Sequence, residues 1–239
     1  FLKLISMSAE KNYPIYLLGS KDEVVKNTAT KLRLLYPKIN IAIAFHVIYP
    51  KKKDNDDNFN ISDKRIDLQI DALNGEYNPT ESTQSFGYKI SQPGYLSEGN
   101  TISGITFYNY KNNGGAYSRT ENNDWFYNTE ENERDIKKKL SIDPNQVINI
   151  YISEANGYLG WAHFPYDFSE DHYMHGLVIS NITIPKSNDD YYKYGRTCIH
   201  EMGHYLGLYH TFQDGCKNND GCDDTPAQHN GDNIYDCEI

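Results

Sequence analysis

Residues 200–210 constrain the fold of this chain more than any other segment. They read His-Glu-Met-Gly-His-Tyr-Leu-Gly-Leu-Tyr-His. Residues four apart on an α-helix lie one above the other, so His200 and His204 are predicted to present two imidazoles from one face. Gly207 adopts a positive φ at little cost, so it can end the helix and let His210 swing back as a third imidazole. The segment therefore requires a helix that is followed at once by a tight turn.

The residue types in this segment indicate a catalytic metal site. Three neutral imidazoles (His200, His204 and His210) leave one position of a tetrahedral zinc ion open, which is typical of catalytic rather than structural zinc. Zinc lowers the pKa of its bound water, and Glu201 is placed to take the proton from that water. A bare HExxH pattern arises by chance in roughly one chain in a hundred, and the added glycine and histidine lower that frequency several-hundred-fold. The alternative, a surface helix with incidental histidines, is therefore disfavoured.

Length and charge exclude several other classes of protein. The chain has 239 residues, enough for one large domain or two small ones. Its formal net charge of −10 argues against nucleic acid as the main partner, since phosphate binding needs a basic face. The acidity suits cation binding and solubility. No apolar run approaches the roughly 18 residues that a membrane span requires.

Apolar periodicity predicts strands and helices that alternate along the chain. Strands are expected over residues 39–47, 104–110, 147–153 and 175–184. Helices are expected from about residue 62 to a stop at Asn74-Gly75, over 131–140, and over 191–206 as the helix of the histidine motif. Strands and helices that are interspersed in this way favour an α/β or α+β fold with one mixed sheet.

The flanks of the motif resemble the pappalysin family of metzincin zinc peptidases. The resemblance covers most of the chain, from about Ile39 to Cys237, and is most specific between Thr197 and Pro226. The segments that carry it are residues 45–49, 160–165, 176–179, 195–199, 211–212, 215–216 and 223–227. It implies a twisted mixed sheet with a backing helix and an active-site helix. It also implies a zinc-dependent endopeptidase that acts on protein or peptide substrates, with a catalytic domain over residues 39–239. Residues 1–38 would be an N-terminal extension or the end of a pro-segment.

The resemblance also bears on the residues around the site. Residues 157–165 are similar to the family's edge strand, along which an extended peptide adds to the sheet. Tyr158 and Trp161 are expected either to line that cleft or to pack as ordinary aromatic residues. The remaining histidines lack ligand spacing of their own; we expect a structural role for His46 and surface or packing roles for the others, which are His163, His172, His175 and His229.

Acidic residues and cysteines crowd the segment after the motif. Hard oxygen ligands at this density suit Ca²⁺, with a solvated acidic turn as the alternative; the oxygen-bearing residues are Asp214, Asp220, Asp223, Asp224 and Thr225. The resemblance implies calcium ligands from the Asp220 carboxylate, the Cys222 backbone carbonyl and Thr225. It likewise implies a disulfide between Cys216 and Cys237, which would place the protein outside the cell. Cys198 is expected to be a buried apolar filler.

One feature departs from the metzincin pattern. Metzincins need a methionine on a turn after the third histidine, yet Met7, Met174 and Met202 all precede His210. We therefore expect the catalytic domain to be incomplete at its C-terminus, cut before the Met-turn. The main alternative function is an inactive zinc-binding fragment or pseudoenzyme that acts as a protein-binding module. A thermolysin-type site with a glutamate as third ligand is disfavoured, because His210 follows Gly207.

Overall fold

A mixed six-stranded sheet forms the centre of the computed structural model, which describes residues 39–77, 105–110, 117–213, 215–217, 220–221 and 228–229. The sheet order is β2-β1-β4-β6-β5, and β3 also pairs with β1. All paired strands are parallel except β5, which runs antiparallel to β6 at the sheet edge. The strands are β1 Ile39–Tyr49, β2 Ile105–Asn109, β3 Ser118–Glu121, β4 Val147–Ser153, β5 Gly160–Ala162 and β6 Leu177–Ser180. The predicted mixed α/β fold is confirmed.

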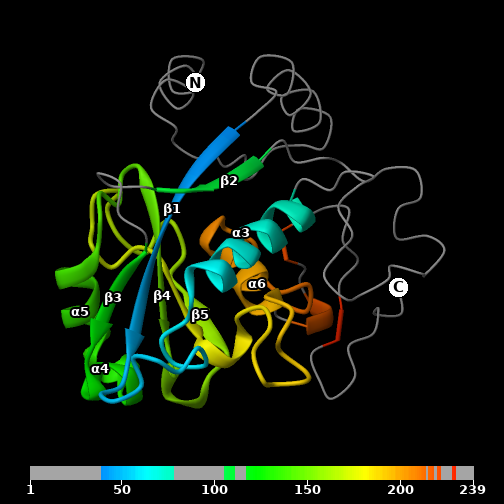
Figure 1. The fold of residues 1–239 in the computed structure, drawn as a ribbon. Helices are drawn as coiled ribbons and strands as arrows, with labels where there is room; N and C mark the ends of the chain where they lie inside the picture. Colours follow the sequence, from blue (N-terminus) through cyan, green and yellow to red (C-terminus); the bar gives the residue numbers. More distant parts are fainter. Residues whose placement is uncertain are drawn as a thin grey trace.

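Helices cover both faces of this sheet (Figure 1). The first pair, α3 (Asp63–Tyr77) and α6 (Arg196–Tyr205), packs on one face, and the second pair, α4 (Asn123–Tyr127) and α5 (Thr129–Leu140), packs on the other. Short 3₁₀ turns lie at Ala155–Gly157, Asn181–Thr183 and Gly215–Lys217. None of the helices in the described ranges is long and apolar enough to cross a lipid bilayer.

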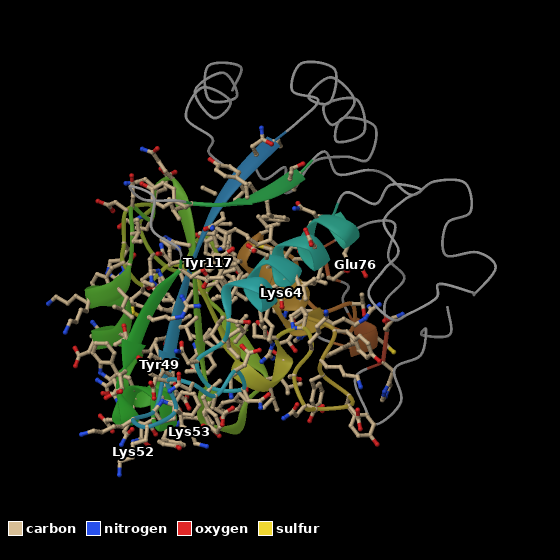
Figure 2. All side chains as sticks on the ribbon, in the orientation of Figure 1. Tyr49, Lys52, Lys53, Lys64, Glu76 and Tyr117 are labelled. Atoms are coloured by element: carbon tan, nitrogen blue, oxygen red, sulfur yellow. The ribbon has the colours of Figure 1, made fainter. Side chains whose placement is uncertain are left out.

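Strand β1 is buried on both faces, as expected for a parallel strand between two helical layers. Its residues Ile43 and Phe45 belong to the core beneath α3 and α6. Ile48 belongs to the core beneath α4 and α5. Figure 2 shows side chains filling the space between the sheet and α3, where Tyr117 meets the Phe45 ring edge-on at 5.8 Å. The sheet therefore forms the middle layer of the fold, and α6 packs against one of its faces.

Helix α3 holds the start of α6 in place. The Gln69 amide donates a hydrogen bond to the Gly195 carbonyl at 2.9 Å, and Glu76, labelled in Figure 2, pairs with Arg196 at 3.7 Å. Gly195 has φ +73°, and a Cβ there would lie 2.8 Å from the Gln69 side chain. Only glycine suits this position, because L-residues rarely adopt such a φ and the Gln69 amide occupies the space. Helix α3 thus fixes the position at which α6 begins.

Two helix boundaries differ from the sequence prediction, each for a local reason. Helix α3 continues past the predicted stop at Asn74-Gly75. The Asn74 side chain bonds both backbone groups of Phe107 in β2, at 2.9 and 2.7 Å, so it joins helix to sheet instead of ending the helix. Helix α6 begins at Arg196 rather than 191, because residues 191–194 form turns and Gly195 takes the left-handed conformation.

The predicted strands lie where the structure has strands, but their predicted lengths agree with the observed ones only in part. The predicted strand over 147–153 matches β4, and the predicted strand over 175–184 shrinks to β6, which passes into a 3₁₀ turn at Asn181. Strand β3 and helix α4 were not predicted. The four residues of β3, Ser118–Glu121, carry no apolar side chain that could have signalled a strand.

His46 has the structural role expected of it. It is 1% exposed and stacks on Tyr151 at 4.8 Å. Its Nε2 lies 2.8 Å from the side-chain oxygen Oδ1 of Asn149. This oxygen also accepts a hydrogen bond from the Ile142 backbone amide, so it acts as an acceptor and Nε2 of His46 carries the proton. Its Nδ1 then accepts from the Ser118 hydroxyl at 2.7 Å. Burial lowers the pKa of His46 to about 4, with the Asn149 hydrogen bond opposing the change, so the ring is neutral at pH 7.

A loss of stability on mild acidification follows from this neutral ring. In the unfolded chain His46 binds a proton below about pH 6.5, whereas in the folded chain it does so only near pH 4. Acidification therefore favours the unfolded state. Between pH 7 and pH 4.5 the expected loss is about 2 kcal/mol. Urea titrations of metal-free protein at both pH values measure it. His46→Phe, which keeps a ring stacked on Tyr151, should lose less stability over this range; an equal loss in both proteins would contradict the assignment.

Candidate metal centre

Helix α6 ends in a turn built around a glycine, as the motif predicts. Gly207 has φ +96° and donates its amide hydrogen to the His204 carbonyl at 2.9 Å. The next amide, from Leu208, donates to the Gly203 carbonyl at 2.9 Å. These two bonds form a Schellman motif, which satisfies the last carbonyls of a helix while reversing the chain. The reversal carries His210 back over the helix end.

The three predicted ligands converge on one point. The Nε2 atoms of His200 and His204 are 3.0 Å apart, those of His204 and His210 are 3.1 Å apart, and those of His200 and His210 are 3.2 Å apart. Nitrogen ligands of tetrahedral zinc, each about 2.1 Å from the ion, would lie about 3.4 Å from one another. Among the described residues this is the group of histidine, cysteine and carboxylate side chains that is gathered tightly enough to hold a metal.

The surrounding atoms leave these nitrogens free to bind a cation. The second ring nitrogen of His204, Nδ1, lies 2.7 Å from the Leu208 carbonyl, so it donates its proton there and leaves an unprotonated Nε2. Burial and the two neighbouring imidazoles lower the pKa of His200. Burial and the His204 ring lower the pKa of His210. Neutral imidazoles are the form that zinc requires, so the donor set fits zinc.

Glu201 lies beside this triangle in a buried position. Its side chain is 8% exposed, and burial raises the pKa of its carboxyl to about 7. Edge strand β5 closes over it at Gly160, where a Cβ would lie 2.8 Å from the Val178 carbonyl oxygen and 3.1 Å from Cγ of Glu201. Because Gly160 has no side chain, the sheet edge can pass close to the Cγ methylene of Glu201. A carboxyl with a pKa near 7 suits general acid–base chemistry.

Comparison with known families shows what the chain around this site is similar to. Residues 130–238 match the family described as pregnancy-associated plasma protein-A, the pappalysin peptidases. Over these residues the chain is similar to the pappalysin metallopeptidases. The matched residues include all of α6 and the turn behind it, so the similarity covers the three-histidine cluster and Glu201.

Curated relatives and solved structures agree with this assignment. An extracellular metalloprotease of Neurospora crassa is 40% identical over 114 residues, which cover 46% of this chain and 39% of that protein. One from Verticillium alfalfae is 28% identical over 197 residues, or 80% of this chain and 58% of that protein. The chain thus spans less than two thirds of either relative. The structure of mature mirolysin from Tannerella forsythia, in complex with a cleaved peptide, superposes with a TM-score of 0.65 at 26% identity, covering 80% of this chain and 73% of that one.

Edge strand β5 is where the resemblance placed it, but its aromatic residue, Trp161, faces away from the three-histidine cluster. Trp161 packs with the core beneath α4 and α5, and its Nε1 donates to the Glu133 carboxylate at 2.9 Å. Trp161 therefore has the packing role that was the alternative to lining the cleft. Tyr158, with 56% of its surface exposed, touches the Trp161 ring edge-on at 6.2 Å.

Two aromatic rings that were not predicted as site residues flank two of the three clustered histidines. The Phe164 ring meets His204 at 5.7 Å, and the Phe212 ring stacks on His210 at 4.8 Å. Neither residue has a spacing that would have marked it beforehand, because each is placed by a turn and not by a helix or strand. Sequence patterns predict the three-histidine cluster but not the aromatic residues around it.

The structure describes only some of the predicted calcium ligands and cysteines. Asp220 is nearly buried at 9% exposure, whereas Cys222, Thr225 and Cys237 lie outside the described residues, as do 1–38. Cys216 is disulfide-bonded, and its pairing with Cys237 stays a prediction. Cys198 is fully buried with a free thiol whose pKa burial raises, which confirms its role as a filler.

Two of the remaining histidines contribute to packing near the site. His163 lies 3.1 Å from the Glu133 carboxylate, and its ring meets Phe168 at 5.0 Å. His175 is buried and meets the Tyr205 ring of α6 at 6.1 Å. Neither joins the three-histidine cluster, in agreement with the packing roles expected for them.

Proposed function

We propose that this chain is a zinc-dependent endopeptidase that hydrolyses peptide bonds of protein substrates. The observation that supports it most is the convergence of three imidazole Nε2 atoms within 3.2 Å of one another next to a buried carboxylate. His200, His204 and His210 would hold the zinc, and Glu201 would be the catalytic base. The names of the relatives as extracellular metalloproteases support both the activity and secretion.

The chemistry divides between the metal and the protein. Zinc, when bound, supplies a Lewis acid that polarises a carbonyl and acidifies water. Glu201 accepts a proton from the attacking water on a carboxylate oxygen and then delivers it to the nitrogen of the departing amine. A pKa of about 7 lets the same carboxyl both accept and return the proton at neutral pH. The His204 ring is held in its binding tautomer by the Leu208 carbonyl.

The open edge of β5 gives the substrate a place to bind. In the described part of the sheet β5 pairs on one side only, with β6, so its other edge is available to an extended peptide. Contact between Gly160 and Glu201 brings a peptide on that edge next to the base. The cleaved peptide in the mirolysin structure supports a peptide substrate for this site.

We further propose that residues 39–239 form the catalytic domain and that it carries calcium after the third histidine. The calcium ligands would be the Asp220 carboxylate, the Cys222 backbone carbonyl and Thr225. The density of oxygen-bearing residues in this segment supports the calcium proposal. A disulfide between Cys216 and Cys237 would close the same region, and disulfides persist outside the cell.

Removal of zinc provides the test of the proposed activity. Incubation with a chelator, followed by its removal, should abolish cleavage of an unfolded casein-like protein, and one equivalent of zinc should restore it. The reason is that the Glu201 carboxylate alone cannot activate both water and carbonyl. Zinc content by mass spectrometry and the rate of cleavage are measured on the same samples.

The alternative of an inactive zinc-binding module gives a different result. Such a module would bind one zinc ion through the same histidines and leave the casein-like substrate intact. His204→Ala, which removes the central ligand, should lose both zinc and cleavage. Full zinc occupancy without any cleavage would favour the binding module over the peptidase.

A further inference from the structure

Three aromatic side chains form a continuous surface that begins at a zinc ligand. Phe164 meets the His204 ring at 5.7 Å and stacks on Tyr166 at 5.3 Å with 7° between the planes. Phe164 also packs against Tyr209 at 5.1 Å. The hydroxyl groups of Tyr166 and Tyr209 are 2.6 Å apart. We call Phe164, Tyr166 and Tyr209 the aromatic shelf.

The shelf is held together although much of it faces solvent. Tyr166 has 57% of its surface exposed and Tyr209 has 39%, so neither belongs to the core beneath α6. Ring contacts to Phe164 and the bond between the two hydroxyls restrain both side chains. Binding of a peptide there would therefore cost these protein side chains little further rotamer freedom, which favours affinity.

The position of the shelf relates it to the substrate path. Phe164 lies two residues beyond the end of β5, while Gly160 at the start of that strand touches Glu201. Tyr209 directly precedes the ligand His210. An extended peptide that follows the β5 edge and crosses the metal therefore passes the shelf within a few residues of the bond to be cut.

We propose that the aromatic shelf recognises one large apolar side chain of the substrate, preferably an aromatic one, within three residues of the scissile bond. The shelf is a specificity determinant, and the inference rests on the proposed peptidase function. Aromatic side chains suit such a surface because flat rings bury a large area and add favourable ring–ring geometry. A polar or small side chain would leave the three rings uncovered.

Peptide binding to zinc-loaded Glu201→Gln protein tests the proposal without relying on cleavage. The probes are an alanine-based host peptide and variants of it, each with phenylalanine at one of six positions around the central bond. One position should bind about tenfold more tightly than the host. In the Tyr166→Ala and Tyr209→Ala backgrounds that preference should fall below about threefold. Tyr166→Phe, which keeps the ring, should retain most of it.

Tyr191→Ala is the matched control, because Tyr191 is 86% exposed and lies outside the shelf. It should keep the full preference, and zinc content is measured in every variant because Tyr209 adjoins a ligand. The proposed role of the shelf would be overturned if all phenylalanine variants bound equally. It would also be overturned if the preference were unchanged in both Tyr166→Ala and Tyr209→Ala with zinc bound. Preference for phenylalanine without any cleavage by the unmodified protein would instead contradict the proposed function alone.

Discussion

Glu201→Gln is expected to slow peptide hydrolysis by about 10²- to 10⁴-fold while zinc stays bound. Glutamine fills the same space between α6 and Gly160, so the contact with the sheet edge is kept. It has no basic oxygen to accept a proton near neutral pH, and it cannot protonate the leaving amine. The three histidine Nε2 atoms are untouched. The rate is measured with a quenched fluorescent peptide, and zinc is quantified on the same protein.

The matched control is Glu130→Gln on the exposed side of α5, which removes the same charge far from the histidines. It should cleave at the rate of the unmodified protein. Comparable cleavage by the Glu201→Gln and Glu130→Gln proteins would show that the observed activity does not come from this site. Loss of zinc from Glu201→Gln would show that the residue supports the metal rather than the proton transfer.

Glu133→Gln is expected to destabilise the fold by about 3–5 kcal/mol, because it leaves a buried ammonium group without its counter-charge. Lys137 is fully buried, and its Nζ lies 2.7 Å from the Glu133 carboxylate. Burial alone would raise the pKa of Glu133, but hydrogen bonds from His163, Lys137 and Trp161 and the charge of Lys137 lower it to about 2. A depressed carboxyl pKa contributes stability above pH 4.5 that is lost as the pH falls toward 2, so the full effect is present at pH 7.

Urea unfolding at pH 7 measures this cost, and a double variant supplies the control. Glu133→Gln with Lys137→Met removes both charges, so it should be less destabilised than Glu133→Gln alone. A loss below about 1 kcal/mol in the single variant would contradict the assigned role. So would a double variant that is as destabilised as the sum of the two single ones.

The convergence of the three histidines was predictable because it is encoded locally. Two histidines four apart, a glycine three residues later and a third histidine specify their own geometry through helix periodicity and a left-handed turn, and the structure reproduces it. The strand β4 was predictable for the same reason, since its apolar residues are contiguous and buried.

Features that depend on distant residues were not predictable from the sequence. Asn74 would ordinarily favour a helix stop, yet its amide bonds the backbone of Phe107, which is 33 residues away. Glu133 gathers Trp161 and His163 from about 30 residues further along the chain. The aromatic shelf likewise joins residues 43 apart through the hydroxyls of Tyr166 and Tyr209. Local patterns do not contain such tertiary pairings.

The Schellman turn at Gly207 has a consequence for how the metal relates to the rest of the fold. All three clustered histidines come from eleven consecutive residues, from His200 to His210, so an ion bound there would close only a very short loop of chain. Closing a short loop restricts the unfolded chain little beyond what the helix already does. Such an ion would therefore act as a local clasp on the last turn of α6. The sheet has hydrophobic cores of its own on both faces, so it is expected to stay folded without the clasp.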